Sequence, residues 1–215
     1  MLIKTLLRGW LAAIALALLP VAPTLAQTQG RDYSLVEPAL PTDTPSKIEV
    51  LEFFSYGCSH CADLHPLMKA WMAKKPADIE LRRVPVTFGN PYNLNLSRLY
   101  YALEALDELK RLDDAVFVAL HQKGLRLLDD RSIFDWVAQQ GVDPTRFAQA
   151  YNSFGVASKV KRGDQLANAA KIRGTPAIVV DGRYLVMGHS HEEQLAIADK
   201  LIAKVRSERN MKPKK

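Results

Sequence analysis

The stretch from Ile48 to Cys61, I-E-V-L-E-F-F-S-Y-G-C-S-H-C, carries the strongest structural signal in this chain of 215 residues. Its first seven residues are apolar, β-branched or aromatic apart from two glutamates, and this composition predicts a buried strand over Ile48 to Phe54. Apolar residues at helical spacing follow from Ser59 to about Lys74. We therefore expect a strand, a tight turn and a helix, with Cys58 where the turn meets the helix.

The chain contains only two cysteines, and both lie in Cys58-Ser59-His60-Cys61. A structural disulfide stabilises a protein mainly by closing a long loop in the unfolded chain, so a bridge over two intervening residues contributes little. The C-x-x-C spacing is therefore typical of a redox pair, of half a metal site or of a minor local staple. His60 and His65 are the residues that would complete a metal site.

The expected place of Cys58 favours redox chemistry. The N–H groups and partial positive charge at a helix N-terminus stabilise a thiolate, which is the nucleophilic form of cysteine. Cys61 lies one turn into the helix, within reach of Cys58 and less exposed. His60, when protonated, would favour the anion further. A stabilised thiolate lowers the free energy of the reduced form, so the disulfide is oxidising and passes out to substrates.

Residues 1–26 have the pattern of a secretory signal peptide. Lys4 and Arg8 precede an unbroken apolar run from Trp10 to Leu19, which is too short to span a bilayer. We expect cleavage after Ala26 and export to an oxidising compartment, where disulfides persist. The net charge of +6 indicates a solvated surface, and no block of basic residues with interleaved aromatic residues predicts nucleic-acid binding.

The rest of the chain predicts further strands around a helical block. A second core strand is expected at 79–86, helical spacing dominates residues 89–166, and a longer helix is expected at 156–172. Strand patterns return on both sides of Asp181-Gly182, which is a two-residue hairpin signal. Ser190 then begins a final helix. This order predicts an α/β fold interrupted by an all-helical insertion.

The segment F-F-S-Y-G-C-S-H-C on a strand, turn and helix resembles the DsbA family of the thioredoxin superfamily, the periplasmic thiol:disulfide interchange proteins. Glu52 matches the family's buried acid beneath the active site, Pro66 its helix kink, and Gly174-Thr175-Pro176 its cis-proline loop. The long segment between Cys61 and Pro176 matches the family's helical insertion. Ser59 departs from the best-known family dipeptide, which has proline there, and this position tunes the redox potential.

The resemblance implies a thioredoxin fold made of residues 27–88 plus 167–215, with an inserted all-helical domain at 89–166. It also implies that the Thr175-Pro176 bond is cis and that Thr175 pairs through its backbone with an extended substrate, as an added strand would. Glu52 would act as a proton acceptor for Cys61, because buried carboxyl groups can exchange protons near neutrality.

The implied activity is that of a dithiol oxidase in the periplasm, which donates its disulfide to reduced, unfolded exported proteins. The expected catalytic residues are Cys58, Cys61 and His60, and Cys58 and Cys61 are expected to form a disulfide. The expected supporting residues are Ser59, Glu52, Thr175 and Pro176. Family resemblance implies reoxidation by a DsbB-type inner-membrane protein linked to quinones. We expect a monomer with no separate cofactor, no bound metal and no nucleic-acid partner.

Three other functions stay open at this point. The protein would be a disulfide isomerase or reductase if it rearranged disulfides better than it formed them. The short polar segment between the predicted signal peptide and the first core strand leads us to expect no N-terminal dimerisation module of the kind usual in such isomerases. It would be a peptide-binding chaperone if its cysteines were dispensable. It would be a metal carrier if the reduced protein held stoichiometric zinc or copper.

Overall fold

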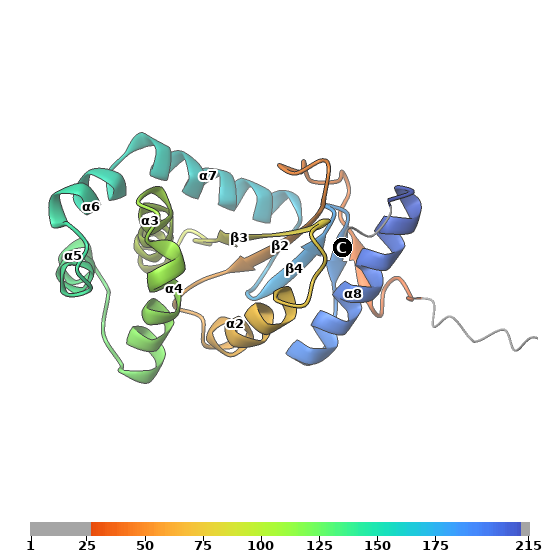
Figure 1. Ribbon diagram of the computed structural model, residues 1–215, viewed down its shortest axis with the longest axis horizontal. Coiled ribbons are helices and arrows are strands. Elements are labelled where there is room, and N and C mark those ends of the chain that lie inside the picture. Colours follow the sequence, from red (N-terminus) through yellow and green to blue (C-terminus); the bar gives the residue numbers. More distant parts are fainter. Residues whose placement is uncertain (1–26, 212–215) are drawn as a thin grey trace, which may run out of the picture.

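The computed structural model describes residues 27–211, which form one five-stranded sheet with helices on both faces (Figure 1). The central strand β2 (Ile48–Phe54) pairs in parallel with β3 (Ile79–Pro85) and antiparallel with β4 (Ala177–Val180). Strands β5 (Tyr184–Val186) and β1 (Tyr33–Leu35) complete the order β1-β5-β4-β2-β3. The signal peptide predicted for residues 1–26 lies outside the described residues.

All seven residues of β2 are buried, as the sequence predicted. The strand has neighbours on both edges and helices on both faces, so it is a continuous apolar run and not an alternating one. Glu52 is fully buried within this run, as the family resemblance implied, and the structure adds that Glu49 is fully buried as well. Each of these carboxylates therefore needs a cationic partner inside the fold.

The hairpin between β4 and β5 confirms the prediction made from Asp181-Gly182. Both residues have positive φ angles, 55° and 66°, which is the backbone of a two-residue type I′ turn. Arg183 closes the turn by donating its backbone N–H to the carbonyl of Val180 at 3.1 Å. The turn leads into β5, which pairs antiparallel with β4. The first residues of β4 lie beside the end of β2.

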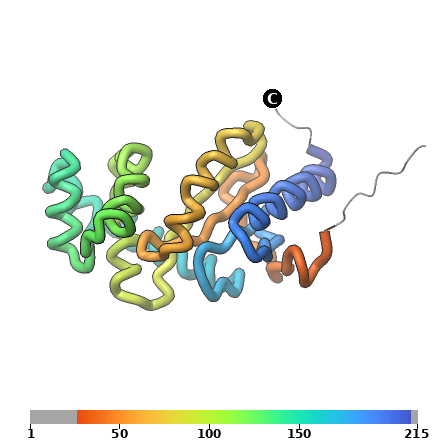
Figure 2. Tube along the Cα trace, turned by 90° about the horizontal axis from the view of Figure 1, so that it is seen from below, coloured from red at the N-terminus to blue at the C-terminus, as the bar shows by residue number. Residues whose placement is uncertain are grey.

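Different helices cover the two faces of the sheet. Helices α2 (Ser59–Met72) and α8 (His191–Glu208) lie side by side under one face (Figure 2), where Leu64 of α2 and Leu201 of α8 pack with Val50. Helix α7 (Phe154–Ala169) covers the other face, where Leu166 packs with Leu51 and Phe53. Helix α2 therefore begins directly at the end of the buried central strand.

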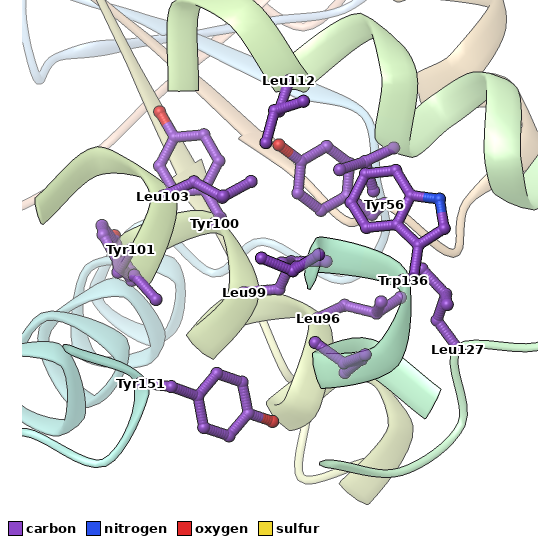
Figure 3. Packing of buried hydrophobic residues seen from close by; sticks show 14 of the residues in the cluster. Tyr56, Leu96, Leu99, Tyr100, Tyr101, Leu103, Leu112, Leu127, Trp136 and Tyr151 are labelled. Carbon is purple, nitrogen blue, oxygen red and sulfur yellow. The ribbon is translucent and has the colours of Figure 1, made fainter. Parts of the chain in front are cut away.

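The helical block lies between β3 and β4 in sequence, and its helices gather at one end of the sheet except for the last one, which runs back over the sheet (Figure 1). It contains α3 (Pro91–Ala105), α4 (Leu109–Phe117), the π-helical turn η2 (Val118–Gln122), α5 (Asp130–Gln139), α6 (Pro144–Tyr151) and α7. Figure 3 shows part of its core, in which Leu99, Leu112 and Trp136 belong to the same cluster of buried residues as Tyr56, which precedes α2 in the chain. Across residues 27–211, every helix is too short or too polar to cross a membrane.

The structure confirms a thioredoxin fold with an inserted all-helical domain, whereas the domain boundaries at 27–88, 89–166 and 167–215 stay predictions. The second core strand and the first helix end one and about two residues before their expected bounds, at Pro85 and Met72, and one longer helix is shifted. The helix expected at 156–172 runs from Phe154 to Ala169, because the Ser153 hydroxyl caps it by accepting from the backbone N–H of Val156 at 3.1 Å. The π-helical turn was not predicted, since no sequence pattern distinguishes it from an α-helix.

We predict that Gly163→Ala destabilises the protein although Gly163 lies within a helix. A Cβ atom there would lie 2.9 Å from the carbonyl oxygen of Pro85 and 3.2 Å from a methyl carbon of Val84, so α7 could pack on β3 only by shifting. Overpacking of this kind costs about 1–3 kcal/mol, more than the gain in helix propensity. The free energy of unfolding, measured by urea denaturation, should fall by that amount.

Gly155→Ala is the matched control in the same helix. Its Cβ would approach nothing closer than the Ser153 hydroxyl at 3.8 Å, so it should leave the free energy of unfolding unchanged or slightly raised. Equal losses of stability in the two variants would show that α7 does not depend on close contact with β3.

Candidate active site

Cys58 lies four residues after Phe54, the last residue of β2, and caps the N-terminus of α2. Its backbone is extended, with φ −89° and ψ 119°, and its sulfur accepts from the backbone N–H of Cys61 at 3.4 Å. Cys61 lies one turn into the helix and is buried, whereas Cys58 is partly exposed, and both are free thiols here. The Cys58 sulfur is therefore accessible to a partner from solvent, whereas the Cys61 sulfur is not.

The two thiols differ sharply in acidity. The pKa of Cys58 is lowered from 9.0 to about 5, chiefly by a hydrogen bond from the Cys61 side chain and further by the Thr175 side chain and the backbone N–H groups of Cys61 and His60. These groups outweigh partial burial, which acts in the opposite direction. The pKa of Cys61 is raised far above its usual value, first by burial and then by its hydrogen bond to Cys58.

The loop before β4 brings Thr175 to the cysteines from 117 residues away in sequence. The Thr175-Pro176 peptide bond is cis, and the Cys58 Sγ lies 3.3 Å from the Thr175 carbonyl oxygen. Antiparallel pairing of Phe53 with Ala177 sets this approach, because it places the start of β4 against the end of β2. Thr175 and Pro176 are both half-buried, so the loop flanks Cys58 at the protein surface.

Ser59 and His60 lie on the exposed first turn of α2. The His60 backbone N–H contributes to the low pKa of Cys58. Its ring lies near the ring of His191 at the start of α8, with 6.4 Å between the ring centroids. The structure thus places Ser59 and His60 beside Cys58, as expected, but the contribution seen from His60 comes from its backbone.

Glu52 is fully buried on the face of the sheet that α2 covers, as the sequence predicted. Its Oε2 accepts from Arg83 at 2.7 Å, and Arg83 also donates to Asp113 of α4 at 2.6 Å. Burial alone would lower the pKa of Arg83, but the carboxylates of Glu52 and Asp113 raise it, so the cation stays charged. In residues 27–211 no hydrogen bond joins Glu52 to either cysteine, so its predicted role as proton acceptor stays a prediction.

Arg83 and Asp113 were not identified from the sequence. Arg83 lies in the expected strand at 79–86, and a basic residue opposite a buried glutamate in a parallel register is the signal that would have identified it. That register becomes visible only once β2 and β3 are paired. Asp113 gives no such signal, because its partner lies in a different part of the chain.

Tyr56 and His121 also approach the site without a sequence signal. The Tyr56 hydroxyl donates to Asp113 at 2.6 Å, and the Tyr56 carbonyl oxygen lies 2.7 Å from the His121 Nε2. A carbonyl can only accept, so His121 Nε2 carries the proton. Burial, followed by the negative charge of Asp113, raises the pKa of Tyr56 well above its usual value, so the phenol stays protonated.

Two groups of side chains in the described part of the chain have metal-ligand atoms within 4.8 Å of one another. The group His65, Asp113 and Asp114 is already occupied by hydrogen bonds and ion pairs with Tyr56, Arg83 and Lys69. The group His60, Asp63 and His191 lies at the surface, at the first turns of α2 and α8, where the partial positive charge of both helices opposes a cation. Neither arrangement favours a metal over the ion pairs and solvent contacts that it has.

The arrangement supports thiol–disulfide exchange. A partly exposed sulfur with a pKa of about 5 is ionised at neutral pH and is both a reactive nucleophile and a stable leaving group. A second thiol one turn away can close a disulfide with it, and its burial shields it from other partners. The backbone of the Thr175 loop lies beside both.

Comparison with known proteins agrees with this chemistry. Residues 49–198 match the family model of the DSBA-like thioredoxin domain. The thiol:disulfide interchange protein DsbA of Bordetella parapertussis is 42% identical over 201 residues, which cover 91% of this chain and 95% of the relative. DsbA of Azotobacter vinelandii is 38% identical over 181 residues, covering 83% of this chain and 84% of the relative.

Solved structures show the same likeness. The crystal structure of Pseudomonas aeruginosa DsbA superimposes with a TM-score of 0.80 at 34% identity, covering 86% of this chain and 97% of that one. The oxidoreductase DsbA from Xylella fastidiosa gives a TM-score of 0.80 at 34% identity, covering 84% of this chain and 98% of that one. With the family model matched across both cysteines and the Thr175-Pro176 loop, the chain belongs to the DSBA-like thioredoxin-domain family.

Proposed function

We propose that this protein is a thiol:disulfide oxidoreductase that donates its Cys58–Cys61 disulfide to reduced, unfolded exported proteins. The observation that carries the proposal is the contrast between the two thiols, with the pKa of Cys58 lowered to about 5 and that of Cys61 raised. The Cys58 thiolate lowers the free energy of the reduced form, so the disulfide gives up its oxidising equivalents readily. Relatives named thiol:disulfide interchange protein support the same activity.

The reaction proceeds by two exchanges. A substrate thiolate attacks the Cys58 sulfur of the disulfide, and Cys61 leaves and takes up a proton, because its high pKa disfavours the thiolate. A second substrate thiolate then attacks the substrate sulfur of this mixed disulfide, and Cys58 leaves as a stable thiolate. The substrate dithiol is oxidised to a disulfide, and the enzyme disulfide is reduced to a dithiol, with no cofactor involved.

The supporting residues have separate proposed roles. Thr175 and Pro176 present a half-buried backbone beside Cys58, on which an extended substrate can pair as an added strand. Glu52 exchanges the proton of Cys61. His60 and Ser59, both exposed beside Cys58, tune the redox potential from the solvent side.

The proposed setting is the periplasm, reached through the predicted signal peptide at residues 1–26. After each cycle the dithiol must lose two electrons, and a DsbB-type inner-membrane protein linked to quinones is the proposed acceptor. Substrate and acceptor would use the same exposed sulfur, since Cys61 is buried. The protein is proposed to act as a monomer.

Isomerase or reductase activity is the nearest alternative. An isomerase must release and re-form disulfides without oxidising the substrate irreversibly, which suits a less oxidising bridge. If the purified protein rescued scrambled disulfides far better than it oxidised reduced chains, the isomerase function would replace the proposed one.

The two cysteine variants should fail in different ways. Cys58→Ser removes the attacked sulfur, so oxidation of a reduced model protein should fall to the uncatalysed rate. Cys61→Ser also loses oxidase activity, because no disulfide can form within the enzyme. Its Cys58 thiolate should still attack oxidised glutathione, keep one half as a mixed disulfide and release one reduced glutathione. Thiol quantification over time and non-reducing gels measure both results. Unchanged substrate folding with Cys58→Ser would instead support a non-catalytic chaperone.

The alkylation rate of the reduced protein should follow the Cys58 thiolate. At and above neutral pH the thiolate is fully formed, and as the pH falls through about 5 it is protonated and the rate declines. Stopped-flow reaction with iodoacetamide between pH 3 and 8, with thiolate absorbance near 240 nm, checks the midpoint. A midpoint near 9, the usual value for a thiol, would contradict the proposed oxidising character.

The free energy of unfolding should depend on redox state and pH together. The Cys58 pKa is depressed in the folded protein, so the thiolate stabilises the reduced fold fully above the unfolded value of about 9, and this contribution is lost as the pH falls to about 5. Because Cys58 is partly exposed, solvent screens part of this contribution. Urea denaturation of both redox forms at pH 8, 7 and 5 should show the advantage of the reduced form shrinking, and a constant difference would contradict it.

A further inference from the structure

Tyr56 makes two hydrogen bonds to a single segment of the helical insertion. Its hydroxyl donates to Asp113 in α4 at 2.6 Å, and its carbonyl oxygen accepts from His121 in the η2 turn at 2.7 Å. Both partners belong to the continuous stretch 109–122, whereas Tyr56 lies two residues before Cys58. The insertion thus contacts the active-site turn through both the side chain and the backbone of one residue.

The π-helical turn brings His121 to this carbonyl. The backbone N–H of Lys123 donates to the carbonyl of Val118, five residues earlier, at 2.9 Å. His121 lies inside this turn, at the fourth of its five residues. Such turns are energetically unfavourable and are found most often at functional positions. The ring of His121 also lies 6.1 Å from the ring of Phe117, which helps to fix its orientation.

The rest of the turn has little freedom to move independently. The backbone N–H of Cys58 donates to the Ser55 carbonyl at 3.1 Å, and the Ser55 hydroxyl pairs with Asn93 of α3 at 3.0 Å. A Cβ atom at Gly57 would lie only 2.7 Å from the ring of Tyr92 in α3. Residues 55–58 therefore lie closely against the insertion, and Tyr56 is their deepest anchor, with only 1% of its surface exposed.

We propose that Asp113 and His121 are positioning residues of the redox site, which act through Tyr56 to hold Cys58 against the N-terminus of α2 and the Thr175 loop. This proposal deepens the proposed function and rests on it. Neither residue touches the sulfur. Each holds the backbone that carries it, so that the donors around Cys58 stay aligned.

The expected direction of the effect follows from charge. Hydrogen bonds to the Cys58 sulfur matter most when it is a thiolate, because bonds to an ionised acceptor are about twice as strong as neutral ones. The disulfide form carries no charge at this sulfur and loses less when the donors are misaligned. Loosening Tyr56 should therefore raise the free energy of the reduced form relative to the oxidised form and make the disulfide less oxidising.

The test compares three variants in the η2 turn. His121→Ala removes the donor to the Tyr56 carbonyl, and His121→Gln restores an N–H donor of similar reach. Gln122→Ala alters the adjacent exposed residue, whose side chain makes no hydrogen bond to residues 55–58 in the described structure. Equilibration with a glutathione redox buffer gives the ratio of oxidised to reduced protein for each. With His121→Ala we expect this equilibrium to shift about two- to tenfold toward the disulfide, the range that one hydrogen bond covers.

The Cys58 thiolate titration, followed by absorbance near 240 nm, is the second readout. It should move to higher pH in His121→Ala and stay at the wild-type position in His121→Gln and Gln122→Ala. Because a merely structural role would change only the free energy of unfolding, thermal unfolding of each variant is recorded beside these two measurements. Identical equilibrium and titration in His121→Ala and wild type would overturn the proposal for His121.

The hydroxyl contact is tested separately. Tyr56→Phe removes the bond to Asp113 and leaves the Asp113–Arg83 ion pair in place, and Asp114→Asn removes a neighbouring charge that does not contact Tyr56. Only Tyr56→Phe should shift the glutathione equilibrium and the thiolate titration. Equal shifts in both variants would show that the two readouts respond to any change beside Asp113 and not to the Tyr56 hydroxyl contact, and would overturn the proposal for Asp113.

These outcomes separate the positioning proposal from the proposed function. If wild-type protein fails to oxidise dithiols but His121→Ala still shifts the thiolate titration, the oxidase function fails and the positioning role holds. If wild-type protein oxidises dithiols and neither variant shifts either readout, the positioning role alone fails.

Discussion

The hydrogen bonds that converge on the Cys58 sulfur come from three directions, and the surrounding structure keeps these donors in place. The first turn of α2 supplies backbone N–H groups, Cys61 supplies its thiol and Thr175 supplies its side chain, while the Thr175 carbonyl oxygen, which can only accept, lies 3.3 Å from the sulfur. Together these donors lower the pKa of the Cys58 thiol to about 5, and the Cys61 side chain contributes most. The antiparallel register of β2 with β4 is the constraint on which this depends, since it brings Thr175 to the helix start.

A cluster of three buried charged side chains lies under α2. Glu52, Arg83 and Asp113 come from β2, β3 and α4. The Glu52–Arg83 pair needs β2 and β3 in register, and the Arg83–Asp113 pair needs α4 docked against β3. Breaking such a cluster by removing one member costs about 3–5 kcal/mol, because it leaves an unpaired charge in the interior. The cluster therefore ties the assembly of the sheet to the docking of the insertion, in addition to any part that Glu52 plays in proton exchange.

The insertion does more than enlarge a small fold. Its core takes in Phe54, Tyr56 and Cys61 from the strand–turn–helix unit, so the catalytic segment is packed partly by residues from another part of the chain (Figure 3). Asp113 and His121 extend the same contact to polar atoms. A thioredoxin fold without an insertion could hold the cysteines at a helix start. In this protein the turn before the cysteines also packs against the helices of the insertion.

The amino-acid sequence by itself was sufficient for the local elements and for the reactive pair. The apolar run of β2, the C-x-x-C motif at a helix start and the Asp181-Gly182 turn are all set by neighbours in sequence, so periodicity and turn chemistry identify them. The resemblance carried by Glu52 and the Thr175-Pro176 loop extended this to the fold and placed Thr175 at the site.

Only the tertiary structure decided which distant groups meet. The pairing of Arg83 with Glu52 needs the strand register, and the grip of Asp113 and His121 on Tyr56 needs both the docking of α4 and a π turn that no sequence pattern marks. The physical reason is that local pattern reports which face of an element is buried, whereas the identity of the group opposite depends on register and crossing geometry. Here those long-range contacts surround the one sulfur whose chemistry the sequence had already located.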